Sequence, residues 1–164
     1  MIIRISARSL LAALFLMGAL SAGRLARAED TLVWLDKSSE SLVSLGYGPV
    51  DPAKNPLFLL SCFNAMSIAV LDVQKEIPGA TPGEKLTIEL SAGDAKASIE
   101  GEAARDEASG VTFGEASDIA VKPVLEVLRA PGQVTVTMGK TSATLSDQGR
   151  GQAVAKFSQD CQLD

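Results

Sequence analysis

Carboxylates are the main residues of this chain that could perform acid–base chemistry, because the sequence contains no histidine. Histidine is the commonest general base and a frequent metal ligand, and its ordinary pKa lies closest to neutrality. Its absence excludes Ser-His-Asp and Cys-His hydrolases and histidine-based zinc and haem sites. The chemistries that remain use carboxylate pairs, Ser-Lys dyads or a free thiolate. A carboxylate-based hydrolase or lyase would draw on Asp36, Asp72 and the acidic segment 100–110.

The acidic residues between positions 100 and 118 could instead bind a cation. Calcium needs several oxygens at about 2.3–2.6 Å from the ion, usually arranged by a D-x-D-x-D-G loop, and no such loop is present. We therefore interpret segment 100–110 as a solvated loop and expect no metal site and no cofactor. The acids concerned are Glu100, Glu102, Asp106, Glu107, Glu115 and Asp118.

Two cysteines, Cys62 and Cys161, are the other residues with distinctive chemistry. In an oxidising compartment two thiols most simply form one disulfide, although a free thiol and an intermolecular bridge are alternatives. The bridge would close a loop of about 100 residues and stabilise the fold by about 4–5 kcal/mol in the loop-entropy account. The spacing differs from the C-x-x-C of redox enzymes, so we expect a structural role.

The N-terminus predicts export. Arg4 and Arg8 precede the apolar run 10–20, which is shorter than a membrane span, and residues 26–28 (Ala-Arg-Ala) form a small-x-small cleavage pattern. We expect a signal peptide over residues 1–28, cleaved after Ala28, with an uncleaved membrane anchor as the alternative. The mature chain, residues 29–164, is then periplasmic or secreted and makes one β-rich domain.

The charge of the mature chain argues against polyanionic partners. The whole sequence carries −5, and the predicted signal contains four arginines and no acid, so the mature charge would be −9. Nucleic acids and anionic bilayers would be repelled by this field. We expect neither nucleic-acid binding nor stable membrane insertion after cleavage.

Alternating apolar residues predict strands over most of the mature chain. Segments 31–36 and 41–47 form a first hairpin, and segments 57–63 and 66–73 form two further strands. Two more hairpins are predicted at Gly93-Asp94 and Gly139-Lys140, where a two-residue turn fixes the register. The predicted facing pairs are Leu90 with Ala97, Ile88 with Ile99, Val136 with Ala143 and Val134 with Leu145.

Apolar residues at helical spacing predict two short helices. One begins near Pro123 and stops at Ala130, and the other includes Phe157 and brings Cys161 onto the sheet. The expected fold is mainly β, an antiparallel sandwich or partly open barrel of about seven to nine strands, with the second helix C-terminal.

These elements favour recognition over catalysis. We expect a non-catalytic exported envelope protein that binds a protein or small ligand, with a carboxylate-based periplasmic hydrolase or lyase as the alternative. Trp34 and Tyr47 are the only large amphipathic rings of the mature chain and form the candidate contact surface. Their hairpin is expected at a sheet edge, where it could also form a homodimer.

The C-terminal third carries a resemblance to known proteins. Residues 144–146 (Thr-Leu-Ser) lead through Gly149, Gly151 and Phe157 to Cys161. This pattern is similar to small exported proteins of alphaproteobacteria and resembles the invasion-associated locus B family. The resemblance implies a role in host invasion. The chain lacks that family's N-terminal Trp motif closely followed by Cys, so no functional residue is transferred from it.

Overall fold

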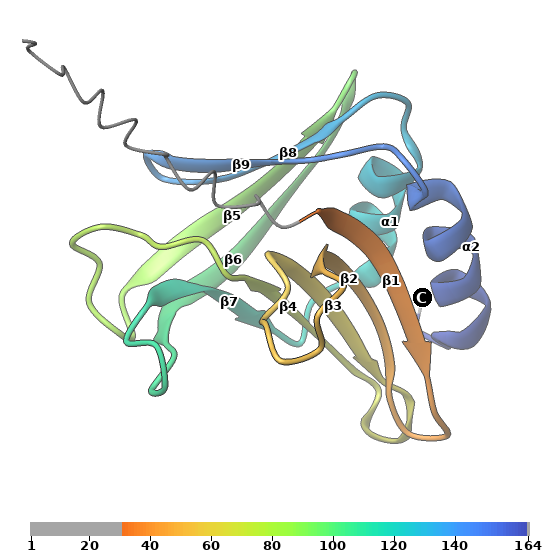
Figure 1. Ribbon diagram of the computed structural model, residues 1–164, viewed down its shortest axis with the longest axis horizontal. Helices are drawn as coiled ribbons and strands as arrows, with labels where there is room; N and C mark the ends of the chain where they lie inside the picture. Colours follow the sequence, from red (N-terminus) through yellow and green to blue (C-terminus); the bar gives the residue numbers. More distant parts are fainter. Residues whose placement is uncertain (1–30, 164) are drawn as a thin grey trace, which may run out of the picture.

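The computed structural model describes residues 31–163 and shows a mainly β fold, so the predicted signal 1–28 lies outside the described residues. Within the described chain, nine strands form one antiparallel sheet in the order β1-β2-β3-β4-β7-β6-β5-β8-β9. The sheet curls into a half-barrel, which confirms the predicted mainly β, partly open barrel (Figure 1). The strands are β1 (Leu32–Ser38), β2 (Val43–Pro49), β3 (Phe58–Phe63), β4 (Ile68–Val73), β5 (Lys85–Ala92), β6 (Ala95–Arg105), β7 (Thr112–Ser117), β8 (Val134–Met138) and β9 (Thr141–Leu145).

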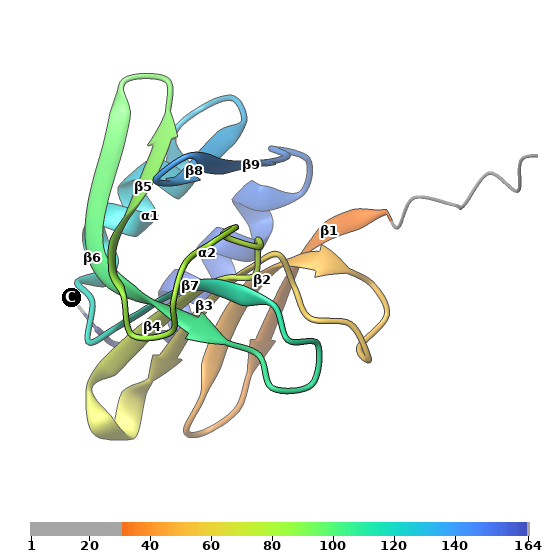
Figure 2. The ribbon, with the colours of Figure 1, turned by 90° about the vertical axis from the view of Figure 1, so that its left-hand side faces the viewer.

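Two helices fill the concave side of the curled sheet (Figure 1 and Figure 2). Helix α1 (Val121–Arg129) packs on β5 and β6, helix α2 (Arg150–Asp160) packs on β1 and β2, and the helices contact each other. The apolar stripe of each helix faces inward, as the spacing predicted: Val124 and Leu128 of α1 and Phe157 of α2 are almost completely buried. Burying each such side chain contributes about 1.5–3 kcal/mol.

The two later hairpins have the predicted register. Leu90 pairs with Ala97 and Ile88 with Ile99, while Val136 pairs with Ala143 and Val134 with Leu145. Gly93 and Gly139 have φ values of 55° and 59°, in the left-handed region that glycine adopts without a steric penalty. The turn residues and the alternation therefore select the same register.

Segment 100–110 was predicted as a loop, and this is wrong for its first half, because β6 continues to Arg105. Gly101 and Ala103 alternate with Glu100 and Glu102, so small residues face the concave side while the acids face outward. Small inward residues suit a strand over which helix α1 packs. The run of charges concealed this alternation.

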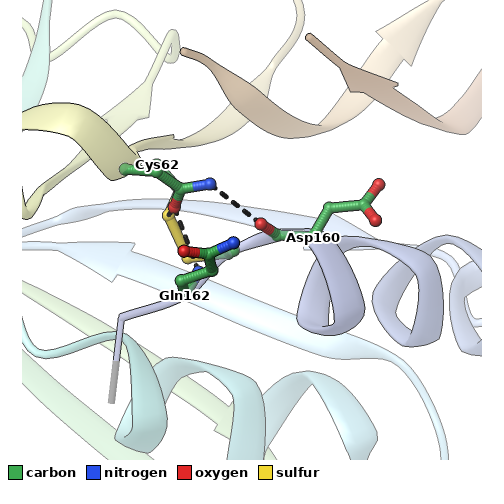
Figure 3. Close-up of a disulfide and its surroundings, with 5 residues drawn as sticks. Cys62, Asp160 and Gln162 are labelled. Atoms are coloured by element: carbon green, nitrogen blue, oxygen red, sulfur yellow. Dashed lines mark hydrogen bonds between the residues drawn. A yellow bond between two sulfur atoms is a disulfide. The ribbon is translucent and has the colours of Figure 1, made fainter. Parts of the chain in front are cut away.

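The predicted disulfide joins Cys62 in β3 to Cys161 at the end of α2, with a Cα–Cα distance of 5.8 Å (Figure 3). The side chain of Asn64 supports it. Its Nδ2 donates to the carbonyl of Asp160 at 2.9 Å, and its Oδ1 accepts from the N–H of Gln162 at 3.0 Å. The disulfide and these two hydrogen bonds thus hold the C-terminal end of α2 against β3 and the turn that follows it. A short 3₁₀ turn, Asn64–Met66, positions the asparagine.

The disulfide is consistent with a non-cytoplasmic location. Among the described residues, none of the helices is long and apolar enough to cross a membrane.

Candidate functional site

Trp34 and Tyr47, the predicted contact surface, are buried, with 8% and 6% of their surface exposed. Their ring centroids lie 5.1 Å apart, and Trp34 also meets Phe58 edge-on at 6.0 Å. The indole Nε1 donates to the carbonyl of Ser146, just beyond β9, at 2.6 Å. The prediction is therefore wrong: the rings face the concave side, where helix α2 packs on β1 and β2. The hairpin does form an edge of the sheet, since β1 is first in strand order.

The two single aspartates proposed for acid–base chemistry lie on opposite faces of the sheet. Asp36 pairs with Leu45, which is completely buried, and so belongs to the concave face. Asp72 pairs with Leu59 and so belongs to the outer face, because directly opposed residues share a face. The structure therefore does not bring Asp36 and Asp72 together.

Asp72 instead lies in a row of carboxylates on the outer face. It pairs with Glu115 of β7, which pairs with Glu102 of β6, which in turn pairs with Lys85 of β5. The negative charge of Glu102 at the end of the row is balanced by Lys85, whose Nζ lies 2.9 Å from Glu102 Oε2. The row crosses four strands that are neighbours in the sheet but not all consecutive in the sequence. The row can therefore be predicted only once the strand order is known.

Asp72 is the most perturbed member of this row. Burial, followed by the negative charge of Glu115, raises its pKa from 3.8 to about 6. Its Oδ1 is buried and has no hydrogen-bond partner among the described residues. A carboxyl that is partly protonated near neutrality beside a second carboxylate is suited to exchange protons with a bound molecule.

A hollow of about 470 Å³ lies beside the other end of this row, lined by Lys85, Glu102 and Glu115 among others, but Asp72 does not line it. Nor does the described chain contain a group of three or more acids or cysteines placed to hold a metal ion.

Asp106, in the loop half of segment 100–110, accepts hydrogen bonds that hold this loop together. Its carboxylate accepts from the N–H groups of Ala108 and Ser109 and from Asn55. These hydrogen bonds, that of Ser109 first, lower its pKa.

A second feature of the outer face is a groove of about 450 Å³ over the first three strands. Its floor follows β2, where Gly46 lies between Leu35 of β1 and Leu59 of β3 in register. Because glycine has no side chain, the two leucines become the walls of a trough. The loop that follows β2 adds Val50 and Pro56.

Polarity changes along this groove. At one end the loop folds tightly over β2: a Cβ placed on Gly48 would lie 2.5 Å from Pro56 Cα, so only glycine allows this approach. At the other end Lys37, Ser44 and Ser61 form the next row on the outer face. The groove is therefore apolar at the Gly46 row and polar with a cation at the Ser44 row, while its loop end combines Val50 and Pro56 with Asp51, Lys54 and Asn55. Sequence reasoning missed it, although glycines at alternate positions of one strand were a visible signal.

Comparisons of this chain with protein-family models, with curated proteins and with solved structures found no match.

Proposed function

We propose that the chain is a non-catalytic exported envelope protein that binds a protein or a small ligand, and that the outer-face groove is its binding surface. One observation carries the proposal. Leu42 and Val50 are 36% and 66% exposed, and with Met66 they are the exposed large apolar residues of the described chain. Leu42 and Val50 line the groove, whereas Met66 does not. Apolar side chains gathered in a concave region that also has a few polar groups are typical of binding sites.

The proposal is tested by comparing the protein with a variant whose groove is filled. A Cβ at Gly46 would lie 3.7 Å from Pro56 Cβ and 3.8 Å from Leu59 Cδ1, so the backbone admits a Cβ, and the methyl groups of Gly46→Val would extend into the trough. Ser98→Val is the matched control, because Ser98 is an exposed strand position outside the groove. Native mass spectrometry and pull-down from envelope extract should find a species retained by the parent and the control. Equal retention by Gly46→Val would contradict a role for the groove.

Export is the second part of the proposal, supported by the disulfide and by the predicted signal. Expression in a bacterium with fractionation should place the protein in the periplasm or medium, and N-terminal sequencing should begin at Glu29. Retention in the cytoplasm with both thiols free would contradict it.

The row containing Asp72 and Glu115 supports a second candidate, a carboxylate-based hydrolase or lyase. The raised pKa of Asp72 beside a second carboxylate favours it. If this candidate were right, a screen of ester, glycoside and uronide substrates would find turnover that Asp72→Asn abolishes. Turnover that persists in this variant would exclude Asp72 from the reaction.

A homodimer through the first hairpin remains a separate proposal. It is supported by the edge position of β1, whose outer side pairs with no strand of the described chain. Sedimentation at increasing concentration would detect it. The variant Val33→Lys, which adds a charge to this edge strand outside the groove, should then shift the equilibrium to the monomer.

A further inference from the structure

We propose that the outer-face groove binds a single-chain amphiphile with an anionic head group, such as a free fatty acid. The tail lies over Gly46 and the head lies beside Lys37. This inference rests on the proposed function and specifies its ligand. It follows from the order of side chains along the groove, from the pairing of the strand beneath it and from the charge at its polar row.

Along β2 an apolar row of side chains is followed by a polar row. The row at Gly46 has Leu35 and Leu59 as its walls, whereas the row at Ser44 has Lys37 and Ser61. Going from Gly48, beside Pro56, to Ser44 covers four residues of β2, or about 13 Å at the rise of a strand. An amphiphile has the same order of tail and head over a comparable length.

The strand beneath the groove has no free backbone edge. The groove lies over β2, and β2 pairs with β1 on one side and β3 on the other. A peptide in the groove would find no unpaired strand edge there, and those of its N–H and C=O groups that face the apolar floor would lose water without gaining a backbone partner. An acyl chain has no such groups. The floor is therefore better suited to a hydrocarbon tail than to an extended peptide.

The charges that line the groove differ in sign from the net charge of the chain. The chain is acidic overall, with a net charge of −5, yet Lys37 lies at the polar end of the groove and is exposed. Asp51, the acid that lines the groove, is at the opposite, loop side, which Lys54 also lines, and its Oδ1 accepts the N–H of Ala53 at 3.0 Å. An anionic head group is favoured beside Lys37, whereas a cationic one would meet a groove lined by two lysines and one acid. The volume of about 450 Å³ lies within the usual range for ligand sites, about 300–1,000 Å³.

The test uses the exported, disulfide-bonded protein and isothermal titration calorimetry with dodecanoate, decanoate and octanoate below their micellar concentrations. We expect one bound molecule per chain. Affinity should fall about two- to fourfold for each methylene removed, since full burial of a methylene corresponds to about fourfold and this groove is open. Dodecan-1-ol and dodecylammonium should bind at least fivefold more weakly than dodecanoate.

Three variants make the test specific to the groove. Gly46→Val should weaken dodecanoate binding at least tenfold, and Lys37→Glu, an exposed change that leaves the core intact, should weaken it about fivefold or more. Ser98→Val should bind as the parent does. Circular dichroism and thermal unfolding must be unchanged in a variant for its result to count, and Lys37→Glu decides the question if Gly46→Val is misfolded.

Four other results would contradict the proposed ligand, and each has a different meaning. Absence of dodecanoate binding, or equal binding by Lys37→Glu and the parent, excludes the amphiphile. Binding to phosphatidylglycerol vesicles without binding to free dodecanoate would indicate a membrane surface instead. If no fatty acid binds but Gly46→Val loses a retained envelope protein, the amphiphile is wrong while the proposed binding function stands. If neither ligand nor protein depends on Gly46, both are wrong.

Discussion

Replacing Asp72 by asparagine is expected to stabilise the folded protein above pH 6, although most substitutions of half-buried residues destabilise. Asparagine has nearly the same shape and carries no charge. In the native protein the ionised carboxylate of Asp72 is disfavoured by burial and then by Glu115, and its Oδ1 has no hydrogen-bond partner in the described chain. Removing the charge removes both penalties.

The size and sign of the effect follow from the pKa. The native pKa of Asp72 is about 6 and its ordinary value is 3.8, so between these pH values the native state binds more protons than the unfolded state. Stability therefore falls as pH rises through this window, and the full penalty is present above about pH 6. At about 1.36 kcal/mol per pKa unit the upper bound is about 3 kcal/mol. Because Asp72 is only half-buried, solvent screening reduces the expected gain to about 1–2 kcal/mol.

The assay is urea unfolding of the parent and of Asp72→Asn at pH 4, 5, 6, 7 and 8. The difference in free energy of unfolding should be close to zero at pH 4, grow through pH 5 and 6, and level off above pH 7. Glu115→Gln should give a smaller gain, because its charge is the lesser cause, and Glu89→Gln, an exposed strand position, should give none. A variant that is less stable than the parent at pH 8, or a difference that does not depend on pH, would refute the reasoning.

Three further predictions concern the framework. Replacing both cysteines by serine should lower the free energy of unfolding by about 4–5 kcal/mol, the loop-entropy value for a separation of 99 residues; urea unfolding that matches the parent would contradict this. Asn64→Ala should lower the free energy of unfolding by about 1–3 kcal/mol, because it leaves a carbonyl and an N–H at the end of α2 unpaired. Hydrogen exchange should then be faster at Gln162 and unchanged in β8. Gly48→Ala should destabilise the loop after β2 because its Cβ would collide with Pro56, whereas Gly46→Ala, whose Cβ has room, should melt within a few degrees of the parent.

Much of the framework could be predicted because local patterns and tertiary structure agree. The turns at Gly93 and Gly139 fixed register through their backbone conformation, and the helical spacing of Phe157 and Cys161 placed the C-terminal helix on the sheet. The disulfide followed from two cysteines on elements that must pack. Strand β7, in contrast, has no clear alternation of apolar and polar residues: Gly114 and Ala116 face inward, and a side chain at Gly114 would collide with Met138.

The misplaced contact surface has a definite physical cause. A strand such as β1, apolar on both faces, can be covered on either side, and sequence does not say which. Here helix α2 packs on the concave side of β1, and the carbonyl of Ser146, distant in sequence, satisfies the indole N–H of Trp34. A ring that finds its polar partner inside the fold has no need of an external one. The apolar residues left for a partner are those of the opposite face, such as Leu35.

The groove was hard to anticipate because it is created by missing side chains. Motif reasoning looks for groups that can react or bind, whereas Gly46 and Gly48 act by leaving space between the walls formed by Leu35 and Leu59. Alternate glycines in a strand weaken it, since glycine loses more conformational entropy on folding and packs no side chain. At Gly48 the close approach of Pro56 accounts for that loss, but a Cβ at Gly46 would meet no clash. Packing therefore leaves Gly46 unexplained, and an occupied groove would explain it. If the Gly46→Val variant unfolds at the same temperature as the parent but no longer binds the ligand, then Gly46 serves ligand binding and not packing.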